Sequence, residues 1–94
     1  MARAERRLFR LNDELVRLRR EQELVEGELG MHRHLADDAT RDAVVTEDPE
    51  NQAEARTAAR DVARLQAALD DVRRKIDRVQ THREELLGRL QDPP

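Results

Sequence analysis

The sequence contains no cysteine, no tryptophan and no tyrosine, and Phe9 is the one aromatic residue among its 94. Without cysteine the chain can form neither a disulfide framework nor a cysteine zinc site, and it has no thiol nucleophile. Only three glycines and three prolines are present, so the bulky side chains and turn residues typical of a sheet-containing core are both scarce. We therefore do not expect a β-sandwich, a barrel or a doubly wound sheet.

Long apolar runs and catalytic motifs are missing as well. No stretch of 18 apolar residues is present, and the three arginines among the first seven residues are not followed by an apolar segment. From this we expect a cytoplasmic protein that does not enter a membrane. The sequence shows neither a glycine-rich phosphate loop nor a nucleophile, base and orienting group in a catalytic arrangement. It therefore predicts a protein that is not an enzyme and needs no cofactor or metal.

Charge is what the chain has in abundance. The chain contains 21 acidic and 18 basic residues, for a net charge of −3. In total 41% of all positions are charged, compared with about 25% in an average domain. Every basic residue except Lys75 is an arginine. The negative net charge and the lack of aromatics for base stacking disfavour direct binding of nucleic acid.

Apolar residues recur three and four positions apart in two long stretches, which we call the seam. A seven-residue repeat of this length is typical of a coiled coil. Three of the 22 seam positions are polar, namely Gln22, His32 and Arg83. The seam consists of Leu8, Leu11, Leu15, Leu18, Gln22, Val25, Leu29, His32, Ala36, Ala39 and Ala43, then Ala55, Ala58, Val62, Leu65, Leu69, Val72, Ile76, Val79, Arg83, Leu86 and Leu90.

A single break separates the two stretches. Pro49 is not tolerated inside a helix but fits the first helical position, and Asp48 before it is a favoured N-cap. The sequence predicts a first helix over about 4–43, a turn over 44–48 and a second helix over about 49–91, ended by Asp92-Pro93-Pro94. Because a short connection makes neighbouring helices antiparallel, we expect residues 1–94 to form one all-α, antiparallel two-helix coiled-coil hairpin. Dimerisation of such a hairpin would give a four-helix bundle.

Charges beside the seam favour one register of this hairpin. If facing residue numbers add to about 101 to 103, Glu14 meets Arg89 and Glu21 meets His82. A turn centred near residue 47 favours a smaller sum. We expect the charge-matched register.

The predicted turn lies in an acidic segment. Residues 37–54 contain seven carboxylates and one arginine, Arg41, for a local charge of −6. Such a run can simply keep exposed faces and helix caps solvated. Alternatively, the tip is a narrow acidic probe that enters a basic cavity of a protein partner, aided by electrostatic attraction. The candidate partner-binding tip consists of Asp37, Asp38, Asp42, Val44, Val45, Glu47, Asp48, Glu50 and Ala53.

The segment Asp48-Pro49-Glu50-Asn51-Gln52-Ala53 resembles the D-x-x-D-x-A tip of the DksA-like and Gre-like regulators of RNA polymerase. In that family the hairpin tip reaches through the secondary channel of the polymerase toward the catalytic magnesium. The resemblance implies a transcription regulator that binds RNA polymerase, with Asp48 as the first tip aspartate and Ala53 as the motif alanine. Asn51 departs from the second aspartate, and the zinc finger and globular C-terminal domain of these regulators have no counterpart here.

A second candidate contact surface lies outside the seam. Phe9, Val16, Leu24 and Met31 follow one another at spacings of seven, eight and seven, which places them on one stripe of a nearly straight helix. One interpretation is scattered surface residues. The others are a homodimer or docking on a different protein, which would make the chain a structural adaptor or scaffold. A lone two-helix hairpin of this size buries little surface, which gives it a physical reason to associate.

Overall fold

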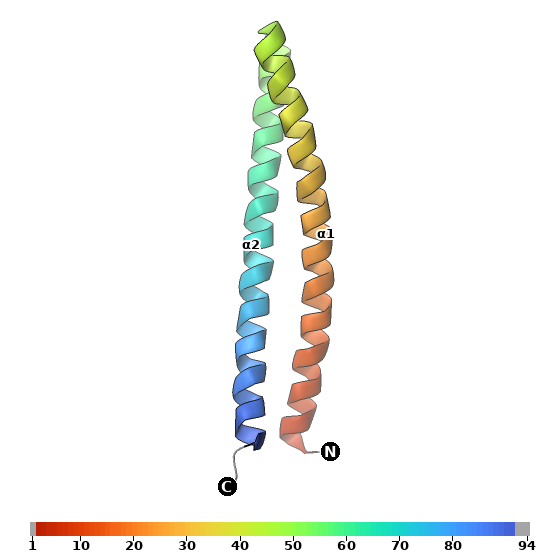
Figure 1. The fold of residues 1–94 in the computed structure, drawn as a ribbon, viewed down its shortest axis with the longest axis vertical. Coiled ribbons are helices and arrows are strands. Elements are labelled where there is room, and N and C mark those ends of the chain that lie inside the picture. Colours follow the sequence, from red (N-terminus) through yellow and green to blue (C-terminus); the bar gives the residue numbers. More distant parts are fainter. Residues whose placement is uncertain (1, 92–94) are drawn as a thin grey trace. The chain divides into compact units, whose positions relative to one another are not determined.

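The structure, a computed structural model, describes residues 2–91, and these form two α-helices without any strand (Figure 1). Helix α1 spans Arg3–Thr46 and helix α2 spans Pro49–Gln91. The predicted all-α helical hairpin is confirmed. The predicted stop at Asp92-Pro93-Pro94 lies outside the described residues.

The chain divides into two compact units. The turn unit is Glu23–Asp70, and the terminal unit combines the described residues of Met1–Gln22 with those of Asp71–Pro94. In each unit a segment of α1 and a segment of α2 lie side by side and antiparallel (Figure 1). Each unit therefore contains its own part of the seam.

The seam positions are the ones that the two helices bury. Of the 22, only Leu90 is exposed, and all the others are buried or half-buried. The core of the terminal unit consists of large aliphatic side chains, whereas the turn unit buries Leu29, Leu69 and the small Ala43. Since alanine buries little apolar area, the turn unit is the less strongly packed of the two. The terminal core is made of Leu15, Leu18, Val72, Ile76 and Val79, with Leu11 packed against it.

A hydrogen bond accommodates Arg83, one of the two polar seam residues of the terminal unit. Arg83 Nε donates to Asn12 Oδ1 over 2.7 Å, and both side chains are half-buried. A polar pair of this kind within a seam stabilises one alignment of two helices over others. The arginine thus has a polar partner at a half-buried position.

The register differs from the charge-matched one. Within the terminal unit the hydrogen-bonded residues Asn12 and Arg83 have numbers that add to 95, and within the turn unit Arg33 and Gln66 add to 99. The expected sum of 101 to 103, which would pair Glu14 with Arg89, is wrong. A two-residue turn between the helices brings the sum close to 95, whereas exposed ion pairs contribute only a few tenths of a kcal/mol each.

Helix α1 also extends further than the sequence predicted. It continues through Val44 and Val45 to Thr46, so that Glu47 and Asp48 alone connect it to α2. The second helix begins at Pro49, as the Asp-Pro pair predicted. Hydrogen bonds from side chains of α2 and of the last turn of α1 hold this end of the helix, as described below.

Candidate functional site: the hairpin tip and the outer face of α1

The tip begins where α1 stops at a left-handed residue. Glu47 has a φ of 50°, and its N–H donates to the carbonyl oxygen of Ala43 over 3.2 Å. This arrangement is the αL helix ending that glycine most often provides. Glutamate is strained at a positive φ, so hydrogen bonds around the turn must hold it in place.

Asp48 then caps the second helix. Its Oδ1 accepts a hydrogen bond from the N–H of Glu50 over 3.0 Å, and its carbonyl oxygen accepts one from the N–H of Gln52 over 3.0 Å. Pro49 stands at the first helical position, where a missing N–H costs nothing. Asp48 therefore has a structural role that is independent of any partner.

Two amide side chains of α2 tie the turn to the end of α1. Gln52 Nε2 donates to the carbonyl oxygen of Ala43 over 3.0 Å, and Asn51 Nδ2 donates to Thr46 Oγ1. The Thr46 hydroxyl in turn donates to the carbonyl oxygen of Asp42 over 2.8 Å. The carbonyl oxygen of Ala43 thus accepts this amide bond in addition to the backbone bond that ends α1. Asn51, which departs from the family pattern, is used here as an amide donor, a bond that a carboxylate could not make.

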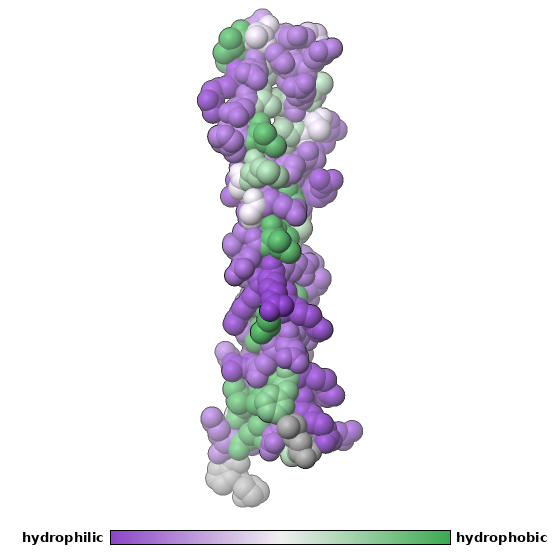
Figure 2. Space-filling view, turned by 90° about the vertical axis from the view of Figure 1, so that its right-hand side faces the viewer, coloured by the Kyte–Doolittle hydropathy of each residue, from purple (hydrophilic) through white to green (hydrophobic). Residues whose placement is uncertain are grey.

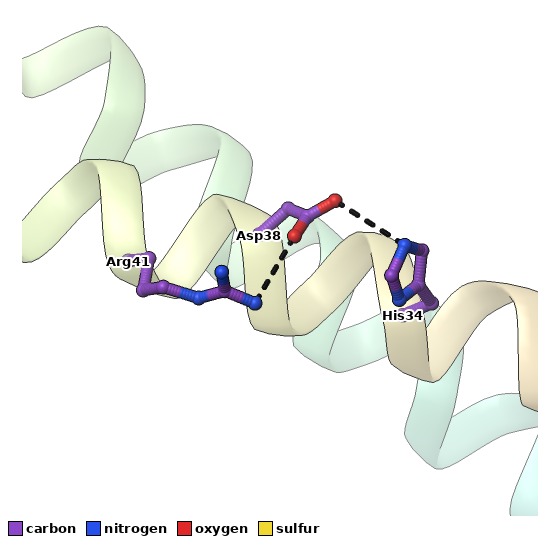
Figure 3. Close-up of polar contacts among 3 residues, drawn as sticks. All are labelled: His34, Asp38 and Arg41. Carbon is purple, nitrogen blue, oxygen red and sulfur yellow. Dashed lines mark hydrogen bonds and ion pairs between the residues drawn. The ribbon is translucent and has the colours of Figure 1, made fainter.

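The carboxylates of the tip are not equivalent. Asp38 lies between Arg41 and His34 on α1, with Oδ1 at 3.2 Å from Arg41 Nη2 and Oδ2 at 3.7 Å from His34 Nε2 (Figure 3). Its charge is therefore partly compensated within its own helix. Asp37 and Asp42 are exposed, and within residues 2–91 neither has an ion pair. The uncompensated negative charge thus lies on the remaining tip carboxylates.

Two valines stand among these charges. Val44 is 74% exposed and Val45 80%, the highest values among the large hydrophobic residues of the described chain. With Asp37, Thr40 and Arg41 they line a shallow depression on α1. The candidate tip therefore combines negative charge with a small apolar spot, whereas capping alone would require only polar residues.

The residues of the predicted stripe are all exposed on α1. Phe9 and Val16 lie on the terminal unit, at 52% and 49% exposure, and Leu24 and Met31 on the turn unit, at 69% and 56%. The structure adds Leu35, also half exposed, which sequence reasoning missed although it follows Met31 by one helical turn. Figure 2 shows how hydrophobic side chains reach the surface in patches among hydrophilic ones. We call these five residues the outer face of α1.

A hollow beside Leu35 extends this apolar surface within the turn unit. It is lined by side chains of both helices, and Ala53 of the candidate tip lies there rather than beside the valines. Ala53 and Leu35 thus line the same hollow. The lining residues are His32, Leu35, Ala53, Glu54, Thr57, Ala58 and Asp61.

The terminal unit presents the opposite charge. A hollow along α1 is lined by Arg7, Arg10 and Arg17 together with Leu11, Asp13 and Glu14. A second one contains Arg3, Arg7, Arg10 and Arg89. These arginines provide a surface that suits an acidic partner.

The described part of the chain contains neither a cluster of metal ligands nor a membrane-spanning helix. No group of three or more histidine, aspartate and glutamate side chains there could hold a metal ion. Neither α1 nor α2, over its described length, has a segment long and apolar enough to cross a bilayer. No family model, no curated protein and no solved structure matches the chain.

Proposed function

We propose that this chain is a non-enzymatic protein-binding hairpin whose tip contacts a basic surface of its partner. The observation that supports the proposal is the exposure of Val44 and Val45 near Asp37 and Asp42, two exposed carboxylates without an ion pair within residues 2–91. Exposed valines at the end of a helix contribute nothing to the packing of the hairpin itself. Burial against a partner would remove them from water, at a gain of roughly 1 kcal/mol or more each.

The charge of the tip determines the kind of partner. Residues 37–54 have a net charge of −6, and Arg41 compensates only Asp38. A cluster of this sign accelerates association with a basic cavity, and the effect weakens as the salt concentration rises. We therefore expect binding to be faster at low ionic strength.

The resemblance of residues 48–53 to the tip of RNA polymerase regulators leads us to propose RNA polymerase as that partner. Asp48 uses Oδ1 for the helix cap, which leaves Oδ2 for a basic side chain of the polymerase. Asn51 supplies an amide donor to Thr46 instead of a second carboxylate. The proposed contact is therefore with basic residues of the channel rather than with its magnesium ion. The chain would act as a small transcription regulator.

Binding of purified RNA polymerase to the immobilised chain tests this proposal. We expect Asp42→Asn combined with Asp48→Asn to weaken binding at least tenfold, because two charges are removed while asparagine preserves the cap. A matched control, Asp77→Asn with Glu85→Gln, removes two exposed charges from α2 and should bind like the wild type. Equal affinity of the tip variant and the wild type would contradict the tip proposal, and no binding of either would remove the polymerase as partner.

A second candidate function is a structural adaptor or homodimeric scaffold that acts through the outer face of α1. The observation that favours it is the exposure of five large apolar side chains on one helix, because surfaces of this kind mark protein contacts. Under this proposal Phe9→Glu with Leu24→Glu dissociates the assembly, as measured by sedimentation equilibrium. Substitutions at the tip carboxylates Asp42 and Asp48 would leave an adaptor complex on the outer face intact.

A further inference from the structure

Gly27 lies in the middle of the outer face of α1. It follows Leu24 by three positions and precedes Met31 by four, so that it shares their side of the helix. A Cβ atom placed on Gly27 would meet nothing within 4 Å, and its φ is not positive. The space over Gly27 therefore leaves room for another helix to approach closely, at a position where glycine weakens the isolated helix.

The sign of the charge reverses along α1. Residues 1–20 contain seven arginines and three acidic residues. Residues 37–54, at the other end of the helix and beyond it, contain seven acidic residues and one arginine. Two such helices attract each other when they run in opposite directions, and they repel each other when they run in the same direction.

We propose that two copies of this chain pair through the outer face of α1, antiparallel, about a twofold axis that passes near Gly27. The inference deepens the second candidate function and rests on it. With facing residue numbers adding to about 54 or 55, Leu24 comes opposite Met31 of the second copy, and Phe9 comes opposite its Val45. The symmetry repeats both contacts, so Phe9, Leu24, Met31 and Val45 of each copy are covered together.

The same alignment matches charges. Asp13 comes opposite Arg41 of the second copy, and Arg17 comes opposite its Asp38. In each case the terminal unit of one copy meets the turn unit of the other. A parallel pair would instead place the seven arginines of one copy on those of the other. A head-to-tail chain, in which the tip binds the arginine-lined hollow of the next copy, would leave Leu24 and Met31 exposed.

Self-association of this kind has a consequence for the tip. Val45 becomes buried against Phe9 of the second copy, so the dimer and a tip-bound partner compete for the same side chain. The concentration of the protein would then control how much of it has a free tip. Dilution releases the tip, and a partner that binds it shifts the equilibrium toward the monomer.

Cysteine cross-linking tests the proposal cleanly, because the chain has no cysteine of its own. Gly27→Cys places the thiol in open space next to the twofold axis, and we expect mild oxidation to convert most of it to a disulfide-linked dimer. Phe9→Cys alone should remain monomeric under denaturing conditions, whereas a mixture of Phe9→Cys and Val45→Cys chains should give a mixed dimer. Arg56→Cys, exposed on α2, is the control and should not cross-link.

Any other pattern of cross-linking would overturn the proposal, and each pattern would indicate a different arrangement of the two copies. Cross-linking of Phe9→Cys with itself would indicate a parallel pair. A mixed Phe9→Cys and Val45→Cys dimer without a Gly27→Cys dimer would indicate a head-to-tail chain. Sedimentation equilibrium distinguishes a wrong geometry from failure of the second candidate function. A wild-type mass near twice 10.9 kDa that falls to half in Phe9→Glu supports an assembly through this face, whatever the direction of the helices. A single-chain mass at all concentrations would contradict both a homodimer and its geometry.

Discussion

Substitution of Asp48 separates the structural role of this residue from its charge. Asp48→Ala removes the acceptor of the 3.0 Å hydrogen bond from the N–H of Glu50, which costs about 1 kcal/mol for an exposed N-cap. Asp48→Asn keeps an oxygen acceptor. It loses a favourable charge at the start of α2, but it also relieves repulsion from Glu47 and Glu50, so we expect a change of only about 0.3 kcal/mol. Asp37→Ala, at an exposed position of α1 without a capping role, should change the stability by less than about 0.5 kcal/mol.

The assay is thermal unfolding followed by circular dichroism at 222 nm, at one protein concentration for all variants because self-association alters the midpoint. For a chain of 94 residues the entropy of unfolding is about 0.2 kcal/mol/K, so a loss of 1 kcal/mol lowers Tm by about 5 °C. We expect this decrease for Asp48→Ala and a decrease of about 1 or 2 °C for Asp48→Asn. Equal midpoints for the alanine and asparagine variants would refute the assignment of Asp48 as a cap.

Three further predictions concern the helices themselves. Leu29→Ala should lower the free energy of unfolding, measured by urea titration, by about 2 to 4 kcal/mol because the side chain is only 2% exposed. Leu24→Ala should lower it by less than about 0.5 kcal/mol. Equal losses in the two variants would contradict the assignment of the seam. Substitution of Asn12 and Arg83 by alanine, singly and together, should give a coupling energy of about 0.5 to 1.5 kcal/mol in a double-mutant cycle, and a value near zero would argue against the observed register. Gly88→Ala should raise Tm by a few degrees, because alanine favours the helix more than glycine does and the added Cβ meets nothing within 4 Å. A lower Tm would show that the added Cβ is not accommodated.

Much of the fold could be predicted because one physical signal extends along the whole chain. The three- and four-residue spacing of apolar side chains marked the buried positions, and only Leu90, one residue before the end of α2, proved exposed. Burial of apolar area is the dominant favourable term in folding, so a pattern repeated over 22 positions outweighs local irregularities. The polar positions in the seam are half-buried as well, and at Arg83 a hydrogen bond to Asn12 accommodates the polar group.

The residue at which α1 ends and the register of the hairpin depend on interactions that are weaker than the burial of apolar side chains. Val44, Val45 and Thr46 have low helix propensities, and no glycine marks a helix end there. The helix continues nevertheless, because the side chains of Asn51 and Gln52 bind groups at its end. Such contacts between residues on different helices cannot be read from a local pattern. The register followed the length of the turn, which could be predicted from the residues only approximately.

For the candidate sites, too, some features could be predicted from the sequence and others depended on contacts between side chains. Exposure of the outer face of α1 could be predicted from spacing, yet Leu35 was missed because it falls outside the seven- and eight-residue steps. The sequence marked the acidic tip but could not tell its carboxylates apart. Asp38 is paired with Arg41, and Asp48 is a cap, and both facts depend on side-chain geometry. Which partner the tip and the outer face bind stays a prediction.

The two-residue turn also influences the order in which the hairpin assembles. The contact of Gln52 with Ala43 closes a loop of nine residues, whereas that of Arg83 with Asn12 spans 71. The longer loop costs about 2 kcal/mol more in chain entropy, so we expect folding to start in the turn unit, where the buried side chains are smallest. The large aliphatic residues of the terminal unit join afterwards. Substitutions near the turn should therefore slow folding, and those in the terminal core should mainly accelerate unfolding.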